Sequence, residues 1–232
     1  AELIATLQAE LGDEQFSFYP GISYRHLLVW HGGRDKMQCV PPHDISTQDI
    51  QDHMPQGEGS AELISLMNSA QMLLANHPVN NARLERGETP ANSIWLWGQG
   101  RRPNMATYQD LYGLTGGVIS AVDLIRGLGV CAGLEIVEVP GATGYIDTNY
   151  LGKGLAAVEL LKRADFAYLH VEAPDEAAHG GLLEEKIKAI EDFDRLVVGT
   201  IIDSLDQLGD CRILVMPDHP TPVELRTHTS DP

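Results

Sequence analysis

Short apolar segments that favour β-strands alternate with helix-like segments along the C-terminal part of this chain. In the helix-like segments, apolar residues recur three or four positions apart. The expected order from residue 118 onward is a strand or strand–helix junction at 118–122, a helix at 121–128, a strand at 135–139, a helix at 154–163, a strand at 166–171, a helix at 182–205 and a strand at 213–216. Such alternation produces βαβ units, so we predict an α/β fold with a mostly parallel sheet flanked by helices.

The part of the chain before residue 93 has a different pattern. We expect a helix at 1–12, strands at 16–19 and 24–30, a polar loop at 34–58, a helix from Ser60 to about residue 76 with Ser60 as its N-cap, and a polar surface segment at 80–91. Pro78 is expected to end the second helix. We therefore predict two domains, residues 1–92 and 93–232, and a composition that is 43% hydrophobic can supply their cores.

The charge and the cysteines restrict the location and the partners. A formal net charge of −17 makes nucleic acid and anionic membrane surfaces poor partners, although a metal or a few arginines can still attract an anionic substrate. Cys39, Cys131 and Cys211 are far apart and fit reduced thiols in a cytoplasmic protein. No apolar run approaches the roughly 20 residues of a membrane-spanning helix. We expect a cytoplasmic protein, and the sequence does not indicate its oligomeric state.

Two acidic–histidine pairs follow predicted strands. Residues 170–179 read HVEAPDEAAH and place Asp175 and His179 four positions apart, so that on a helical turn they share a face and can bind one ion. The alternative is that Asp175 caps a helix and His179 is a surface residue. Asp218 and His219 follow the predicted strand at 213–216. Adjacent residues on an extended backbone point in opposite directions, so this pair suits two neighbouring ions unless the chain turns sharply.

His228 adds a fifth donor, although a lone histidine is usually a packing or surface residue. Together the five residues lie within 54 positions of one βαβ pattern. Carboxylates and imidazoles without a thiolate suit Mn²⁺, Mg²⁺, Co²⁺ or Zn²⁺. Two such ions side by side are typical of phosphoryl transfer, in which one activates the nucleophile and the other stabilises phosphate oxygens.

Several motifs resemble one enzyme family over nearly the whole chain. They are residues 170–179, KIKAIEDFD at 186–194, PDHPTP at 217–222, RTHT at 226–229, SYRH at 23–26, PPHD at 41–44, IWLWG at 94–98, PGATG at 140–144, Asp147-Thr148 and Lys153. These motifs resemble the cofactor-independent phosphoglycerate mutases of the archaeal type, which belong to the alkaline phosphatase superfamily. Bacterial members have also been called homoserine kinases.

The resemblance implies a fold, a reaction and roles for particular residues. It implies that residues 93–232 form part of an alkaline-phosphatase-like domain and that residues 1–92 form most of an inserted α/β substrate domain. It implies two divalent ions, with Mn²⁺ the first choice, and no 2,3-bisphosphoglycerate. By motif, Asp175, His179 and His228 resemble the ligands of one ion, Asp218 and His219 resemble ligands of the other, Lys153 resembles the lysine that stabilises the transferring phosphoryl group, and Arg25 and Arg83 lie where substrate-binding arginines are expected.

The implied reaction interconverts 3-phosphoglycerate and 2-phosphoglycerate through a phosphoserine in glycolysis and gluconeogenesis. We expect the nucleophilic serine and another metal-binding aspartate of the family to lie before Ala1, and a family tail to follow the RTHT motif, so that this chain is a fragment. Two alternatives remain open. One is another phosphotransferase or phosphatase of the superfamily that acts on a small phosphate ester, and the other is a non-catalytic metal-binding fragment. Each arginine can equally be a solvated surface charge.

Overall fold

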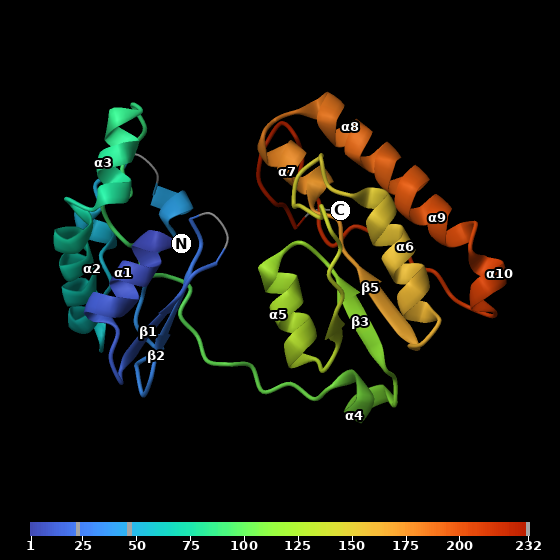
Figure 1. Ribbon diagram of the computed structural model, residues 1–232, viewed down its shortest axis with the longest axis horizontal. Coiled ribbons are helices and arrows are strands. Elements are labelled where there is room, and N and C mark those ends of the chain that lie inside the picture. The colour runs from blue at the N-terminus through green and yellow to red at the C-terminus, as the bar shows by residue number, and fades with distance from the viewer. Residues whose placement is uncertain (22–23, 46–47, 231–232) are drawn as a thin grey trace. The chain divides into compact units, whose positions relative to one another are not determined.

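The computed structural model describes residues 1–21, 24–45 and 48–230, which form two compact units, 1–102 and 103–232 (Figure 1). Ser23 of the SYRH motif lies outside the described residues. The units divide after Arg102, whereas we placed the domain boundary near residue 92. Ile94 and Leu96 pack against the core of the first unit, which is why the linking segment up to residue 102 groups with it. The assignment of residues 1–92 and 93–232 to a substrate and a catalytic domain stays a prediction.

The first unit packs two helices on a β-hairpin. Helix α1 (Glu2–Leu11) precedes strands β1 (Phe16–Tyr19) and β2 (Leu27–Trp30), which pair antiparallel with Phe16 opposite Trp30. Short 3-10 turns at Pro42–Ile45 and Gln51–His53 lead to helix α2 (Ser60–Leu74). The core consists of Ile4, Leu7, Phe16, Phe18, Leu66, Ala70 and Leu74. Burial of these apolar side chains from three elements stabilises the unit.

Two expectations for the first unit were wrong. Ser60 is the first residue of α2, and Gly59 precedes it in the left-handed region with no side-chain cap. Helix α2 already ends at Leu74, and Pro78 instead begins helix α3 (Pro78–Glu85), where its missing N–H costs no hydrogen bond. Residues 81–91 are exposed or half-buried, as expected for a surface segment. Asn80 of α3 is buried and is hydrogen-bonded to Leu74 and to both backbone groups of Ala91. A polar residue with buried partners cannot be recognised from polarity alone.

The second unit is built on a parallel sheet with the strand order β4-β3-β5. After helix α4 (Tyr108–Tyr112), strand β3 (Gly116–Ile119), helix α5 (Asp123–Cys131), strand β4 (Glu135–Ile136), helix α6 (Tyr150–Leu161) and strand β5 (Phe166–Leu169) follow in sequence. Successive strand residues face opposite sides of a sheet. Val118 packs with Ile125 of α5 and Ile119 packs with Ala157 of α6, so the two helices cover opposite faces. The predicted α/β class is confirmed.

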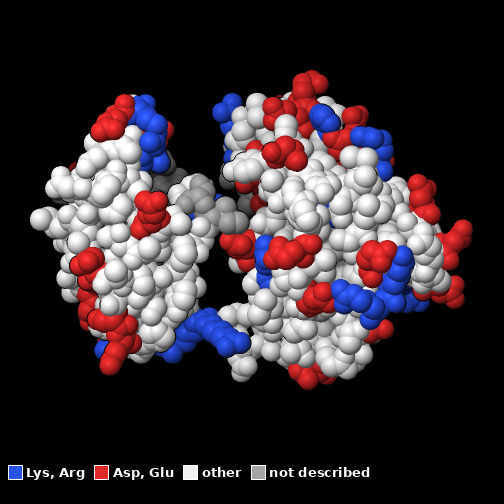
Figure 2. Space-filling view, viewed as in Figure 1, with Lys and Arg blue, Asp and Glu red and all other residues white. Residues whose placement is uncertain are grey.

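Of the helices after β5, the last ones run in succession along one side of the second unit (Figure 1). Helix α7 (Ala173–His179) is followed by α8 (Leu183–Asp192), a π-helical segment (Phe193–Val198), α9 (Gly199–Ile202) and α10 (Leu205–Leu208). We expected one helix over 182–205, and the π-helical segment interrupts its α-helical hydrogen-bonding. Within the described residues, none of the helices is long and apolar enough to span a membrane. Acidic side chains are spread over the visible faces of both units (Figure 2).

The strand expected at 213–216 is absent from the described sheet, so that expectation was wrong. These residues have no assigned secondary structure, and Leu214 and Met216 are 82% and 67% exposed. The apolar pattern is that of a strand, but a strand also needs a neighbour for its backbone hydrogen bonds. The strand predicted at 135–139 is shorter than expected, because only Glu135–Ile136 pairs with β3.

Candidate metal centre

Helix α7 presents Asp175 and His179 on one face. It begins shortly after β5, with Pro174 in its first turn and His179 as its last residue. Ala173, Ala177 and Ala178 are buried. Because these side chains are small, α7 packs closely on α8. Asp175 does not cap the helix, and its carboxylate instead accepts a hydrogen bond from Thr221 in the C-terminal segment.

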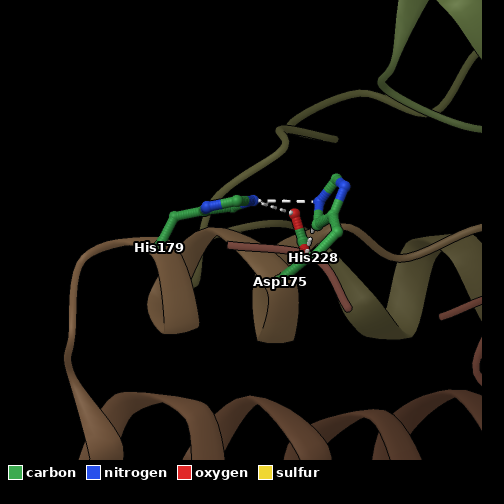
Figure 3. Close-up of side chains that lie close together, drawn as sticks. All are labelled: Asp175, His179 and His228. Carbon is green, nitrogen blue, oxygen red and sulfur yellow. Dashed lines mark hydrogen bonds and ion pairs between the residues drawn. The ribbon is translucent and has the colours of Figure 1, made fainter. Parts of the chain in front are cut away.

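Three of the five predicted ligands come together (Figure 3). The Nε2 atom of His179 lies 3.2 Å from Oδ2 of Asp175 and 3.0 Å from Nε2 of His228, while Nε2 of His228 lies 3.4 Å from Oδ1 of Asp175. Donors that share a tetrahedral ion at about 2.1 Å lie roughly 3.4 Å apart. The spacing and the donor types therefore fit one divalent ion of the Mn²⁺ or Zn²⁺ kind.

The His179 ring is held in an orientation that suits a ligand. Its Nδ1 atom lies 2.9 Å from the carbonyl oxygen of Arg226, so this nitrogen carries the proton and Nε2 faces the other two donors. Arg226 has a φ of 54°, in the left-handed region that residues with side chains seldom adopt. Strained backbone of this kind persists where the surroundings enforce it. Here it directs a carbonyl at the histidine.

Asp218 and His219 lie beside this cluster. The chain bends at both residues, and the carboxylate Oδ2 of Asp218 comes within 3.5 Å of Nε2 of His219. The bend brings both side chains to one side, although we expected neighbouring residues on an extended backbone to point apart. The ring centroids of His219 and His228 are 3.9 Å apart. The pair can contribute two donors to an ion next to the first.

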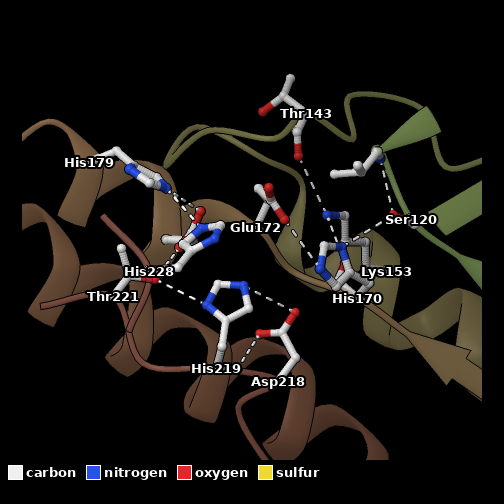
Figure 4. Close-up of polar contacts among 12 residues, drawn as sticks. Ser120, Thr143, Lys153, His170, Glu172, His179, Asp218, His219, Thr221 and His228 are labelled. Atoms are coloured by element: carbon white, nitrogen blue, oxygen red, sulfur yellow. Dashed lines mark hydrogen bonds and ion pairs between the residues drawn. The ribbon is translucent and has the colours of Figure 1, made fainter. Parts of the chain in front are cut away.

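Lys153 enters the same region from α6 (Figure 4). Its side chain is 1% exposed, and Nζ donates to the carbonyl oxygens of His170 and Thr143 at 3.3 and 3.5 Å. Burial lowers the pKa of Lys153 to about 8, and the nearby Glu172 carboxylate opposes this shift. An amine in such a setting still carries most of its charge near neutral pH and can neutralise an anion that enters the site.

Sequence reasoning assigned no role to three neighbours of Lys153. The imidazole of His170 lies between Ser120 and Glu172, with Nδ1 3.3 Å from Oγ of Ser120 and Nε2 3.2 Å from Oε2 of Glu172. Burial lowers the pKa of His170 and raises the pKa of Glu172. His170 and Glu172 lie two positions apart just after β5, inside the motif at 170–179, and this spacing is the sequence feature that could have identified them. Thr221, which contacts two predicted ligands, gave no signal of its own.

The two predicted substrate arginines lie in the first unit. Arg25 is exposed, and its guanidinium lies 5.6 Å from the ring centroid of Tyr24. Arg83 donates from Nε to the carbonyl oxygen of Thr89 at 2.8 Å and lies 3.8 Å from the Glu88 carboxylate. Arg25 is thus available to an anion, whereas Arg83 is partly occupied at the end of α3. Their role in binding substrate stays a prediction.

Comparison with known proteins identifies the family of the chain. A family profile described as Metalloenzyme superfamily matches residues 51–232, and one described as 2,3-bisphosphoglycerate-independent phosphoglycerate mutase matches residues 1–80. A Geobacter sulfurreducens protein named "Probable 2,3-bisphosphoglycerate-independent phosphoglycerate mutase" is 60% identical over 231 residues, covering 100% of this chain and 58% of that protein. A Methanosarcina acetivorans protein with the name 2,3-bisphosphoglycerate-independent phosphoglycerate mutase is 52% identical, covering 99% and 58%. The chain spans less than two thirds of the length of these relatives.

Two solved structures are also similar. A Pyrococcus horikoshii protein is 32% identical with a TM-score of 0.63, over 74% of this chain and 45% of that one. The cofactor-independent phosphoglycerate mutase of Thermoplasma acidophilum has a TM-score of 0.53 at 22% identity, over 85% of this chain and 53% of that one. At that identity the second likeness shows the fold alone.

Proposed function

The chain belongs to the metalloenzyme superfamily and is homologous to 2,3-bisphosphoglycerate-independent phosphoglycerate mutases, and on this premise we propose that its protein interconverts 3-phosphoglycerate and 2-phosphoglycerate. The observation that carries the proposal is the cluster of Asp175, His179 and His228, which has the donors and spacing of a divalent-metal site in a chain with such relatives. The substrate is accordingly a small phosphate ester, and no 2,3-bisphosphoglycerate is required. We also propose a cytoplasmic location, in keeping with three unpaired cysteines.

We propose that two divalent ions bind side by side, with Mn²⁺ as the first choice. Asp175, His179 and His228 would hold one, and Asp218 and His219 would supply donors to the other. When bound, such ions lower the pKa of a coordinated hydroxyl and offset charge on phosphoryl oxygens. Asp218 and His219 are too few donors for a complete site. We propose that the remaining donors, an aspartate and the nucleophilic serine of the resembled family, lie in a part of the protein outside this chain.

The proposed reaction transfers one phosphoryl group twice. The serine oxygen bonds to phosphorus while the bond from phosphorus to the 3-oxygen of the substrate breaks, and the serine proton passes to that oxygen. The glycerate reorients, and its 2-hydroxyl oxygen bonds to phosphorus while the bond from phosphorus to the serine oxygen breaks. The 2-hydroxyl proton passes to the serine oxygen, which regenerates the serine. The Lys153 ammonium is proposed to stabilise charge on the phosphoryl oxygens, because a buried positive charge acts strongly in a low-dielectric site. Arg25 and Arg83 are proposed to bind the substrate carboxylate and phosphate.

The test is an assay of the full-length protein with Mn²⁺ and either phosphoglycerate. We expect formation of the other isomer without release of phosphate, loss of activity on chelation, and recovery on adding Mn²⁺. Release of phosphate without isomerisation would instead identify a phosphatase, and ATP-dependent phosphorylation of homoserine would identify a kinase. Either result overturns the mutase proposal.

Asp175→Asn tests the metal site directly. The change keeps the shape of the side chain but removes a charged ligand, so we expect activity to fall by at least about 100-fold, the scale for losing one charge-stabilising contact. Binding of Mn²⁺ should also weaken in a titration of metal-free protein. Asp206→Asn, at an exposed aspartate of α10, is the matched control and should change neither quantity. Wild-type binding and activity in Asp175→Asn would remove Asp175 from the site.

A further inference from the structure

Thr221 joins the two halves of the metal centre through one hydroxyl. The residue is 5% exposed, and its Oγ1 atom donates to Oδ1 of Asp175 at 2.5 Å. The same atom lies 3.2 Å from Nδ1 of His219 (Figure 4). A hydroxyl has a single proton, which goes to the carboxylate, so oxygen must accept the second hydrogen bond. His219 therefore carries its proton on Nδ1, and Nε2 keeps the lone pair that a metal ligand needs.

The backbone around Thr221 fixes the position of this hydroxyl. Lys186 of α8 donates from Nζ to the Thr221 carbonyl oxygen at 2.7 Å. Pro220 and Pro222 restrict the dihedral angles on either side. The backbone N–H of Thr229 donates to the carbonyl oxygen of Pro220 at 3.1 Å, which closes the segment on itself. A hydroxyl held from the main chain and from a neighbouring helix can impose its geometry on the side chains that it contacts.

We infer that Thr221 is a positioning residue that sets the distance between Asp175 and His219, and so between the two ions that these residues are proposed to hold. The inference rests on the two-ion site of the proposed function. Without the hydroxyl, the Asp175 carboxylate can rotate and His219 can place its proton on either nitrogen. Both changes reduce the fraction of protein molecules whose ligands are arranged to bind the ions. One substitution should therefore lower the affinity for both ions. Loss of a hydrogen-bonding partner behind metal ligands typically costs about 10- to 100-fold in affinity.

The experiment measures Mn²⁺ binding to the metal-free full-length protein without substrate, following the free Mn²⁺ signal by electron paramagnetic resonance. Thr221→Val keeps the shape and removes the hydroxyl, and we expect both dissociation constants to rise about 10- to 100-fold. Thr221→Ser keeps the hydroxyl and should stay within about threefold of the wild type. Thr200→Val is the matched control, because that hydroxyl donates to the carbonyl oxygen of Leu196 within the helical segment, and it should bind as the wild type does.

Several results would overturn the inference. One is a Thr221→Val protein that folds and binds both ions with unchanged affinity, or that binds only one of them more weakly. Others are a wild type that binds a single ion, and a Thr221→Ser protein that binds Mn²⁺ as weakly as Thr221→Val does. If Thr221→Val does not fold, comparison of Thr221→Ser with Thr221→Ala isolates the hydroxyl in the same way. Phosphoglycerate interconversion by the wild type is measured separately. An inactive wild type whose two Mn²⁺ sites respond as expected defeats the proposed function and leaves the role of Thr221 standing.

Discussion

Lys153 carries an amine into the interior of the second unit, where its charged form is costly. It contacts carbonyl oxygens rather than a close carboxylate partner, and burial lowers its pKa from 10.5 to about 8. Between pH 8 and 10.5 the unfolded chain binds this proton more than the folded chain does. The contribution of Lys153 to stability therefore improves as pH rises through that window, and its penalty is fully present below pH 8. A residue kept at such a cost is typical of a functional site.

Lys153→Met should stabilise the protein while impairing its function. We expect a gain of roughly 1–3 kcal/mol in the free energy of unfolding at pH 7, because one pKa unit corresponds to about 1.4 kcal/mol and lost hydrogen bonds offset part of the gain. The gain should shrink as pH rises from 8 to 10.5, as followed by urea unfolding at several pH values. Lys162→Met, at a more exposed lysine after the same helix, should show neither effect. A pH-independent gain in Lys153→Met would contradict the burial argument.

The roles of single residues could be predicted where the residue type itself indicates a chemical function. Aspartates and histidines at expected strand ends indicated metal ligands, and Asp175, His179 and His228 do lie together. Thr221 and Ser120 could not be found this way, because threonine and serine occur everywhere and their partners are 46 and 50 positions away. The hydrogen bonds that orient a ligand depend on tertiary contacts, and those contacts leave no periodic pattern in a sequence.

The turn between α7 and α8 lies close to Arg226, whose backbone is in the left-handed region, beside the predicted metal ligands. Gly181 has a φ of 71°, and a Cβ atom placed there would lie 2.6 Å from Nε of Arg226. Arg226 is the residue whose carbonyl oxygen orients His179. The glycine thus serves two purposes, since it permits the turn and leaves room for the arginine side chain.

Gly181→Ala should destabilise the turn and loosen the metal site. Left-handed backbone costs a residue with a side chain about 1–2 kcal/mol, which lowers the melting temperature by several degrees in a domain of this size. We expect a lower melting temperature by calorimetry and weaker Mn²⁺ binding. Gly127→Ala is the matched control in α5, where φ is not positive and no atom lies within 4 Å of the new Cβ. It should be neutral or stabilising, since alanine favours a helix. Equal melting temperatures for the two variants would refute the strain argument.

Elements with their own hydrophobic face were predicted well, as α1 and α2 show. The strand predicted at 213–216 was wrong. The composition of these residues favours a strand, but a strand also needs a neighbouring strand, which no local pattern encodes. Proline at 78 illustrates a third case. We expected it to end α2, but α2 ends at Leu74 and Pro78 begins α3. Only the cap supplied by His77 distinguishes this helix start from a loop.

The residues proposed to bind metal and those proposed to bind substrate lie in different units. All five predicted metal ligands and Lys153 belong to residues 103–232, whereas Arg25 and Arg83 belong to residues 1–102. The change of pattern near residue 92 indicated two parts in advance. The segment that links them could not be assigned to a side, because packing of Ile94 and Leu96 on the first core is a tertiary contact.

Metal binding should therefore protect one unit and leave the other unchanged. Mn²⁺ at 100 times its dissociation constant stabilises the folded state by about 2.7 kcal/mol. We expect slower amide hydrogen exchange in α7 and in residues 218–228 when Mn²⁺ is added to the metal-free protein, measured by mass spectrometry. The core of α1 and α2 is the internal control. Equal protection of both units would contradict a metal centre confined to the second.

The uncovered run at 213–216 has a consequence for this chain in concentrated solution. These four consecutive apolar residues have exposed side chains and, within the described part of the chain, no strand partner, so a second copy can associate with them. A net charge of −17 keeps copies apart, but salt screens that repulsion beyond about 8 Å at physiological ionic strength. Solutions of the isolated 232-residue chain should consequently stay clear in dilute buffer and turn cloudy as salt is added, which is the reverse of salting-in.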